Sequence, residues 1–527
     1  MLRATIEYRR ANLIRDVALG AGILALIWTL TGWILEGASG TVVLTGLGLA
    51  VAAITLAILN NWRLGFYLFL LWMLSEDLVR KYMGNNMAIF FAKDVLVGLT
   101  YVSFFVALRR GQVESFRPRF LLPLSLFFWL GLGQVFNPSS PGVLYGLLGL
   151  KLYFYYVPLM FVSYALIQTE KELHHFLVIS VALAGAIALL GVIQAIAGPT
   201  FLNPSVLAPE LRTLGNLTRA SPITGQMSYR PTSVFVSDGR FSSFLILAWI
   251  LEFGAAGYLR LRVSRRQRVV LLSIGVTTAA IVLSGSRGAL LWTAGSACVL
   301  AAAMLWGAPW KWRQGHRLVK AIRRMFLFAA IGIYFLILVF PSAVGARWAL
   351  YSESLSPWSP ASELAQRTWD YPIKNLMLAF SDPQWPYGHG IGTASLSVQY
   401  VSRLLGENPR EIGVESGFGT LIVEMGILAP VLWLAWSFVL LRSGWQVVRS
   451  LKATSYFPIG VSILLFTALL LIAFTYVALA PYQNYVLNAF LWILVGVLFR
   501  LPILRAREAV PAQPRFERSF VVSPQAF

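Results

Sequence analysis

The chain is 527 residues long, of which 57% are hydrophobic and only 12% are charged. A soluble domain usually carries about 25% charged residues, so this composition excludes a soluble enzyme, a fibrous protein and a disordered chain. Apolar runs long enough to cross a hydrocarbon core of about 30 Å recur along the sequence. An outer-membrane barrel is also excluded, because its strands would alternate polar and apolar residues over about ten positions. The sequence therefore predicts an all-α, polytopic transmembrane helical bundle.

The net charge of +21 does not indicate a nucleic-acid partner, because the basic residues follow the apolar runs in a regular way. Lys and Arg gather in stretches that the alternation of spans places on one side of the membrane, which is the positive-inside pattern. This pattern predicts that both termini are cytoplasmic. The basic stretches are residues 3–15, 109–119, 260–268, 311–324, 442–452 and 500–518.

The apolar runs predict about 12–14 spans. They lie at residues 17–36, 42–60, 64–77, 88–108, 120–136, 143–167, 176–197, 241–259, 269–285, 288–307, 325–341, 417–441, 457–479 and 484–500. We divide the chain into N-terminal helices (1–140), central helices with an outer loop at 198–240 (141–341), a large extracytoplasmic loop (342–416), C-terminal helices (417–500) and a cytoplasmic tail (501–527).

The loop at 342–416 is too long for an ordinary connection, so we expect it to carry structure of its own. Residues 361–380 have the pattern of an amphipathic helix, which Pro372 kinks or divides. Ser381, Asp382 and Pro383 predict its end. The alternate glycines of residues 386–393 predict that the backbone approaches a ligand or another helix closely.

Three arginines lie at or near the ends of predicted membrane spans, where a charged side chain costs free energy. Arg287 occupies a very short turn between two apolar runs, where an arginine costs about 2.5 kcal/mol or more unless it serves a site. Beside helix-terminal N–H groups it would form an anion site; a simple interfacial arginine is the alternative. Arg230 and Arg240 precede the span at 241–259, where pairing with Asp238 or lipid headgroups competes with a functional role. We interpret Arg212 and Arg219 as ordinary loop charges.

Carboxylates provide candidates for acid–base chemistry. Glu415 lies where the outer loop re-enters the membrane, and such a group can act as a base or form a salt bridge with a nearby arginine. We interpret Glu424 as a structural partner. Lys93 and Asp94, inside a span, are expected to pair with other helices, with an ion relay as the alternative.

Motifs for metal and nucleotide chemistry are missing from the sequence. By this topology His389 is the one histidine on the outer side, so we expect no outer histidine-based metal site. The sequence has neither the paired aspartates of nucleotide-sugar transferases nor a Gly-Lys-Ser/Thr phosphate loop. Transport driven by ATP and chemistry on nucleotide sugars are therefore disfavoured.

Five short elements, in order along residues 140–440, resemble those of the O-antigen ligase and O-antigen polymerase superfamily. Ser284–Ala289 (Ser-Gly-Ser-Arg-Gly-Ala) resembles its Ser-Arg-Gly element, and Arg230–Phe235 resembles its Arg-Xaa-Xaa-Gly-Xaa-Phe element, with Ser233 where glycine is usual. The other three elements are Gly191–Gln194, Arg367–Trp369 with Pro386–Gly392, and Glu424–Leu428.

The resemblance implies a GT-C-like membrane glycosyltransferase of the bacterial cytoplasmic (inner) membrane. Its donor would be an undecaprenyl-diphosphate-linked oligosaccharide and its acceptor a glycan or lipid. It would work without a cofactor and without a metal, and polysaccharide-assembly proteins are further partners that it suggests. The resemblance assigns Arg287 and Arg230 to the diphosphate, with Arg367 and Arg240 as lesser candidates. Glu415 would be the base, with His389 as the alternative.

One departure bears on the reaction. Where ligases of this superfamily usually carry a His-Asn pair, this chain has Glu415-Ser416. This difference favours a polymerase of exopolysaccharide or O-antigen over a ligase that transfers glycan to lipid A-core. A flippase or other transporter of lipid-linked oligosaccharide and a non-catalytic assembly protein are the alternatives from other functional classes.

Overall fold

The computed structural model describes residues 39–83, 87–204, 217–262, 267–309, 341–364, 366–406 and 414–509, together with single positions between 320 and 338. The predicted span at 17–36, nearly all of that at 325–341, the tail beyond 509 and Arg212 lie outside the described residues.

The described part of the chain is mostly helical, and eight of its helices are long and apolar enough to cross a membrane. Three shorter apolar helices add to them, Gly48–Asn60, Leu121–Gln134 and Gln267–Leu283. The fold is that of a helical, multi-pass membrane protein. The eight candidates are Met87–Arg109, Val143–Leu166, Glu170–Ala197, Asp238–Leu261, Arg287–Gly307, Leu428–Ser450, Phe457–Val477 and Tyr485–Glu508.

The chain forms two compact units, and the division passes through two helices. The smaller unit comprises Met1–Phe69 and Asp94–Ala107, so it holds α2 (Ser39–Asn60), the start of α3 (Trp62–Tyr82) and most of α4 (Met87–Arg109). Within it, the Ser103 hydroxyl on α4 donates to the Leu59 carbonyl at 3.0 Å. Gly65 allows α3 to approach Thr100 closely.

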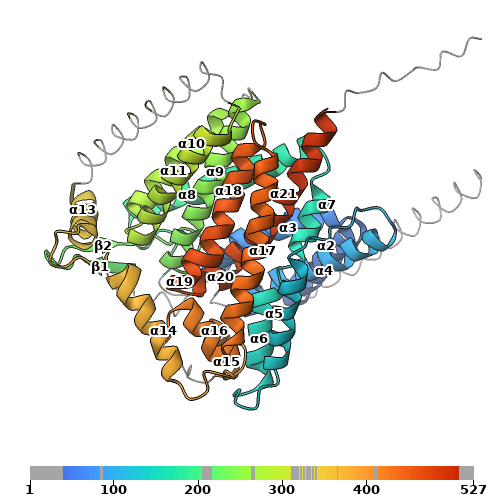
Figure 1. Cartoon of the computed structure of the whole chain (residues 1–527), viewed down its shortest axis with the longest axis horizontal. Coiled ribbons are helices and arrows are strands. Elements are labelled where there is room, and N and C mark those ends of the chain that lie inside the picture. Colours follow the sequence, from blue (N-terminus) through green and yellow to red (C-terminus); the bar gives the residue numbers. More distant parts are fainter. Residues whose placement is uncertain are drawn as a thin grey trace, which may run out of the picture. The chain divides into compact units, whose positions relative to one another are not determined.

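The larger unit comprises Leu70–Lys93 and Leu108–Phe527 and contains a bundle of long helices. In this bundle α9 packs against α8, α10, α11 and α18, and α18 packs against α17 and α21 (Figure 1). The bounds are α8 Glu170–Ala197, α9 Asp238–Leu261, α10 Gln267–Leu283, α11 Arg287–Gly307, α17 Leu428–Ser450, α18 Phe457–Ala468 and α21 Tyr485–Ala509. Shorter pieces, the π-helix η4 (Leu469–Phe474), α19 (Thr475–Val477) and α20 (Ala480–Gln483), connect α18 to α21.

Two predicted spans are broken in the structure. The run at 143–167 forms α6 (Val143–Phe154) and α7 (Leu159–Leu166), because Pro158 before α7 cannot donate a helical hydrogen bond. The run at 417–441 forms α16 (Gly417–Met425) and α17, separated at Gly426, whose φ of 75° is a left-handed conformation that ends a helix. Preceding α6 and packed against it is α5 (Leu121–Gln134).

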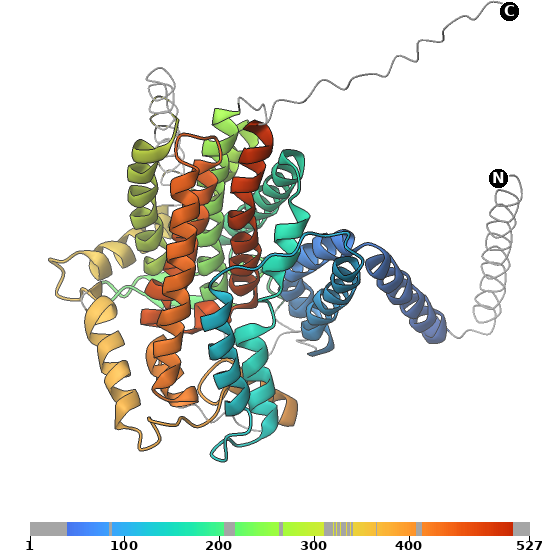
Figure 2. The same ribbon diagram turned by 45° about the vertical axis from the view of Figure 1, so that its right-hand side comes forward.

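Segments predicted to share a side of the membrane contact one another. At one end of the larger unit, Arg262 bonds Glu170 at 3.2 Å and also bonds Glu508, and Arg507 bonds Glu114 at 3.2 Å. The segments predicted to lie outside gather at the opposite end from the C-terminal end of α21, shown in red in Figures 1 and 2. The two sides of the membrane to which these segments were assigned stay a prediction.

The large predicted outer loop carries structure of its own, as expected. It contains α13 (Pro341–Leu355), a π-helix η3 (Gln366–Asp370), α14 (Tyr371–Ser381) and α15 (Ser397–Leu405). The expected division near Pro372 is confirmed, since α14 begins at Tyr371 with the proline in its first turn. The expected end is also confirmed, because α14 stops at Ser381 and Asp382 is extended.

A β-hairpin in the loop at 198–240 was not predicted. Its strands β1 (Thr218–Ala220) and β2 (Met227–Tyr229) are too short to give an alternating pattern. The Glu353 carboxylate of α13 accepts from the backbone N–H groups of Ile223 and Thr224, at 2.7 and 3.2 Å, and holds the tip of the hairpin.

The glycine-rich turn lies against the end of α16, as its spacing predicts. The backbone N–H groups of His389 and Gly390 donate to the carbonyls of Val423 and Glu424, at 2.8 and 2.9 Å. Gly388 has a φ of 79°, and a Cβ on it would lie 2.6 Å from the Glu424 carbonyl oxygen. The turn therefore needs glycine both for its conformation and for its close approach.

We predict that Gly388→Ala lowers the free energy of unfolding by about 2 kcal/mol, because the side chain adds strain and a backbone collision. Thermal unfolding of the detergent-solubilised protein measures this effect. The control is Gly133→Ala in α5, where an added Cβ meets nothing within 4 Å and should leave the midpoint unchanged or raise it. Equal midpoints for both variants would contradict the prediction.

Candidate functional site

A carboxylate shared by three arginines forms the centre of the candidate site. Glu363, which precedes η3, pairs with Arg287 (Nη1–Oε1, 2.8 Å), Arg367 (Nε–Oε2, 3.4 Å) and Arg219 (Nη2–Oε2, 3.5 Å). Arg287 is the first residue of α11, whose N-terminus is capped by the Ser286 hydroxyl. The helix end thus adds its own positive potential to that of the guanidinium groups.

A fourth arginine lies near this group. Arg230, directly after β2, forms an ion pair with Asp238 at the start of α9. Burial lowers the pKa of Arg219, and repulsion from Arg287, Arg230 and Arg367 lowers it further, partly offset by Glu363. Four arginines within reach of one another, against two carboxylates, leave a net positive charge. We call Arg219, Arg230, Arg287, Arg367, Glu363 and Asp238 the arginine cluster.

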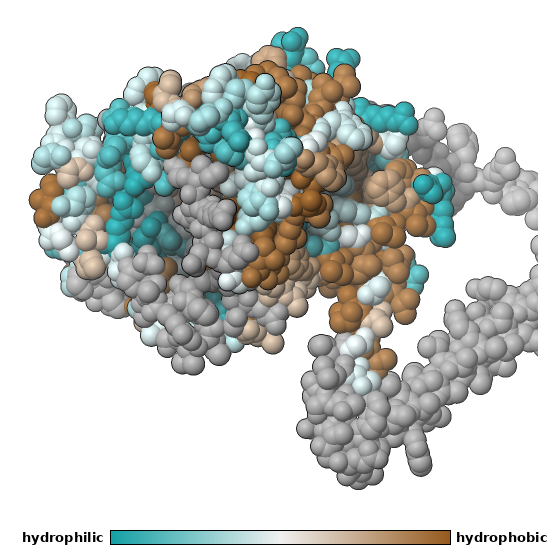
Figure 3. All heavy atoms as spheres, turned by 90° about the horizontal axis from the view of Figure 1, so that it is seen from below, coloured by the Kyte–Doolittle hydropathy of each residue, from teal (hydrophilic) through white to brown (hydrophobic). Residues whose placement is uncertain are grey.

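The cluster lies on a hydrophilic part of the surface. In the view from that end of the molecule, hydrophilic side chains gather in the region that holds α13, α14 and the β-hairpin in Figure 1 (Figure 3). Arg287 is nonetheless only 12% exposed and Arg230 20% exposed. Partial burial strengthens their attraction for an anion relative to that of fully solvated arginines.

A buried arginine, Arg347, holds together the segments that carry the arginine cluster. The Arg347 guanidinium of α13 donates to the Leu283 carbonyl at 2.8 Å and to the Tyr229 carbonyl at 3.0 Å. The Tyr351 hydroxyl donates to the Val282 carbonyl at 2.9 Å. These bonds connect α13, β2 and the end of α10, and so place the turn before Arg287 against the hairpin.

Glu415 is connected to the arginine cluster through Tyr371. The Glu415 carboxylate lies beside the Tyr371 hydroxyl and raises the pKa of the tyrosine. The Arg367 guanidinium lies over the ring of the same tyrosine, 5.4 Å from its centroid. The Asn375 side chain accepts from the Glu415 backbone N–H at 3.1 Å. Tyr371, at the start of α14, therefore bridges the predicted base and a predicted diphosphate ligand.

Glu415 also lines a pocket of about 390 Å³ between α15, α16 and α20. The volume lies within the usual range for small-ligand sites. Hydroxyl, amide and carboxylate groups share the lining with small apolar side chains. The lining residues are Ala394, Ser395, Leu396, Val398, Gln399, Val414, Glu415, Thr420, Ala478, Leu479, Ala480 and Gln483.

His389 lies apart from Glu415, in the glycine turn, and does not line this pocket. Its Nε2 is 2.7 Å from the Asp382 carboxylate. Burial acts to raise the pKa of Asp382, but hydrogen bonds from the Gln384 backbone and from His389 outweigh it, so the pKa is lowered. The structure thus separates the two predicted bases, and Glu415 is the one connected to the arginine cluster.

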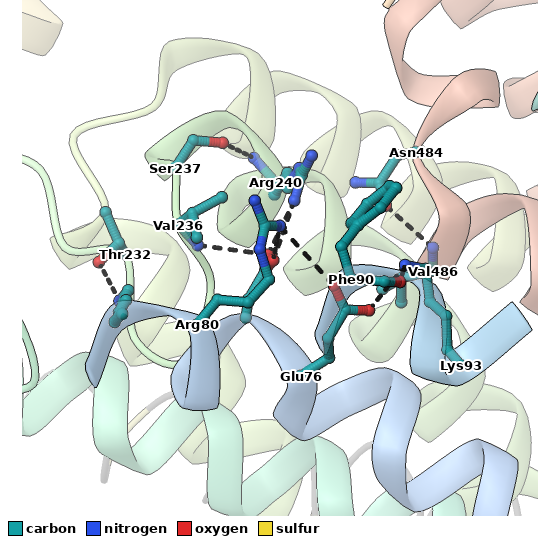
Figure 4. Close-up of polar contacts among 12 residues, drawn as sticks. Glu76, Arg80, Phe90, Lys93, Thr232, Val236, Ser237, Arg240, Asn484 and Val486 are labelled. Atoms are coloured by element: carbon teal, nitrogen blue, oxygen red, sulfur yellow. Dashed lines mark hydrogen bonds and ion pairs between the residues drawn. The ribbon is translucent and has the colours of Figure 1, made fainter. Parts of the chain in front are cut away.

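Arg240, predicted as a lesser diphosphate ligand, belongs to a different network. Its Nη1 lies 2.9 and 3.1 Å from the two oxygens of Asp77, which also binds Arg80 at 3.0 Å. Asp77 and Arg80 are almost fully buried. Figure 4 shows Arg80 and Arg240 converging beside Glu76 and Lys93. Because both oxygens of Asp77 contact Arg240, we assign this arginine a structural role.

The same network explains two other charges. Lys93 pairs with Glu76 at 2.9 Å, which confirms the expected pairing with another helix. Lys81 is fully buried and donates to the Thr232 hydroxyl at 2.9 Å and to the Ser233 carbonyl at 2.6 Å. The end of α3 therefore holds residues 232–240, the segment that leads from Arg230 into α9.

Glu424, which we interpreted as a structural partner, is fully buried at the end of α16. Its carboxylate accepts from the Tyr153 hydroxyl at 2.7 Å and from the Ala394 backbone N–H at 3.1 Å. It thus connects α6 and the glycine turn to α16.

The sequence interpretation missed several residues of the site. It treated Arg219 as an ordinary loop charge and did not foresee that Arg219 pairs with Glu363. Glu363, Arg347 and Tyr371 were not considered at all. The sequence indicated these three residues only through their position in the loop that was predicted to be structured.

The sequence matches no protein-family model, and neither curated proteins nor solved structures give a match. The resemblance to the O-antigen ligase and polymerase superfamily therefore stays a prediction. Within the part of the chain that the structure describes, no three His, Cys, Asp or Glu residues are grouped so that they could hold a metal ion.

We predict that Asp77→Asn lowers the free energy of unfolding by about 3–5 kcal/mol, because it removes the buried carboxylate that pairs with both Arg240 and Arg80. Thermal unfolding in detergent measures the loss. In the double variant Asp77→Asn/Arg240→Gln the destabilisation should be smaller than the sum of the two single effects. Strict additivity would show that the pair is not coupled.

We predict that the stabilisation from Glu363 depends on pH. The hydrogen bond from Arg287 lowers its folded-state pKa below the ordinary 4.5. The carboxylate therefore stabilises the fold above about pH 4.5, and this contribution is lost as the pH falls through the lower folded-state value. Thermal midpoints of wild type and Glu363→Gln between pH 7 and pH 3 should differ at neutral pH and converge in acid. A gap that widens in acid would contradict this sign.

Proposed function

We propose that the protein is an integral-membrane glycosyltransferase that uses an undecaprenyl-diphosphate-linked glycan at the outer face of the bacterial cytoplasmic membrane. The observation that carries the proposal is the arginine cluster, whose positive excess lies next to a carboxylate-lined pocket. A diphosphate needs several fixed cations, and an acceptor hydroxyl needs a base. The cluster and Glu415 supply both, with Tyr371 between them.

In the proposed reaction, the acceptor hydroxyl attacks the anomeric carbon of the donor sugar. A bond forms between that carbon and the acceptor oxygen, and the bond to the phosphate oxygen breaks. Undecaprenyl diphosphate leaves with the electron pair, so negative charge develops on its bridging oxygen. Arg287 and Arg230, both partly buried, would stabilise this charge, with Arg367 and Arg219 beside them. Fixed cations at such a position typically contribute more than any other catalytic group.

Glu415 would accept the proton of the attacking hydroxyl. Its carboxylate lines the pocket and lies beside the Tyr371 hydroxyl. His389 is the weaker candidate, because its Nε2 is engaged by Asp382 and it lies outside the pocket. We favour a polymerase of exopolysaccharide or O-antigen, since Glu415 occupies the position where ligases of the resembling superfamily carry histidine.

A transporter of lipid-linked oligosaccharide is a second candidate, and one observation favours it. Glu76, Asp77, Arg80, Lys81 and Lys93 form a buried charged network with Arg240. Buried charges inside a membrane bundle often mark ion or substrate pathways. Five of these six side chains are almost fully buried, however, whereas the arginines of the cluster are partly exposed, so an anion can reach them, and we place the glycosyltransferase first.

We expect the purified protein to lengthen undecaprenyl-diphosphate-linked repeat units in the presence of EDTA. Arg287→Ala should reduce the rate by roughly 100-fold, because it removes a cation from the leaving group. Glu415→Gln should reduce it by a similar factor, through loss of the base. Gel separation of the lipid-linked products measures chain growth.

The control is Arg449→Ala, an exposed arginine in the last turn of α17, which should leave the rate unchanged. Transfer that occurs only after lipid A-core is added would identify a ligase. Movement of the donor across a vesicle membrane without any transfer would refute the enzyme and support the transporter.

A further inference from the structure

The pocket beside Glu415 differs in charge from the arginine cluster. Its described lining contains one carboxylate, Glu415, and no Lys, Arg or His. The cationic cluster instead gathers around Glu363, on the far side of Tyr371 from Glu415. The two neighbouring parts of the site are thus suited to groups of different charge, the cluster to an anion and the pocket to a group without negative charge.

The polar groups of the pocket are suited to hydroxyl groups. The Thr420 hydroxyl donates to the Ser416 carbonyl at 3.0 Å, which leaves its oxygen as an acceptor. The Gln483 carbonyl oxygen accepts from the Leu396 backbone N–H at 3.1 Å, which fixes the side-chain amide. Ser395 and the exposed Gln399 complete this set. These four side chains are all neutral.

The apolar lining provides a surface for the C–H face of a ring. Ala478, Leu479 and Ala480 line the pocket, and the two alanines leave room for a ligand. A pyranose presents hydroxyl groups around its edge and C–H groups on its faces, so it fits a pocket with both kinds of lining.

We propose that this pocket binds the acceptor and is selective for an uncharged sugar at the acceptor end. The inference rests on the proposed glycosyltransferase function and adds the acceptor's chemical class to it. A sugar carboxylate or phosphate in the pocket would lie beside the Glu415 carboxylate, and like charges at short distance repel even where, as here, the carboxylate is exposed. A neutral hexose or acetamido sugar meets no such repulsion and can donate a hydroxyl proton to Glu415.

Equilibrium binding tests this selectivity without turnover. A neutral hexose glycoside and the matching hexuronic acid glycoside are titrated into the full-length protein in detergent, without donor. Wild type should bind the neutral glycoside at least tenfold more tightly. In Glu415→Gln the ratio should fall to about threefold or less, because the repelling charge is gone. Asp370→Asn removes an exposed charge that does not line the pocket and should keep the wild-type ratio.

A second variant tests whether the glycoside binds in this pocket. Ala480 is exposed at the pocket, so Ala480→Trp should block it with little effect on folding. The neutral glycoside should then lose at least tenfold in affinity, while binding of an undecaprenyl-diphosphate-linked donor persists. Equal binding of both glycosides by wild type, or unchanged binding by Ala480→Trp, would overturn the inference. Selective binding without any glycan transfer would instead refute the proposed enzyme and leave the pocket assignment standing.

Discussion

The candidate site depends on the Glu363 carboxylate. Its two oxygens bind arginines from three separate parts of the chain, β1, the start of α11 and η3. Without this acid, three guanidinium groups would repel one another in a partly buried region. One carboxylate therefore allows three arginines to lie together while a positive excess remains.

The surrounding fold supports this arrangement with buried polar contacts. Arg347 bonds backbone carbonyls of the hairpin and of the end of α10, and the end of α3 holds the segment between Arg230 and α9. Each of these contacts requires a charged group to lose its hydration, which costs free energy. The hydrogen bonds that the buried group makes offset this cost. They set the distance between Arg287 and Arg230.

The two parts of the site differ in charge, and this difference assigns the donor and the acceptor of the proposed reaction to different places. The arginine cluster suits the diphosphate of the donor, and the neutral pocket with Glu415 suits an acceptor hydroxyl. Tyr371 contacts both through its hydroxyl and its ring. In the proposed reaction, donor and acceptor would therefore meet at α14.

The sequence by itself determined the class of the protein, because apolar run length and the placement of Lys and Arg are local properties. It also indicated Arg287 and Arg230 by their unusual positions, and it located the break at Pro372 and the close approach at Gly388. The tertiary structure decided how the charges pair. Arg240 meets Asp77 and Arg219 meets Glu363 across more than 140 positions of sequence. No local pattern encodes such a partner, since an ion pair depends on where the helices place both ends.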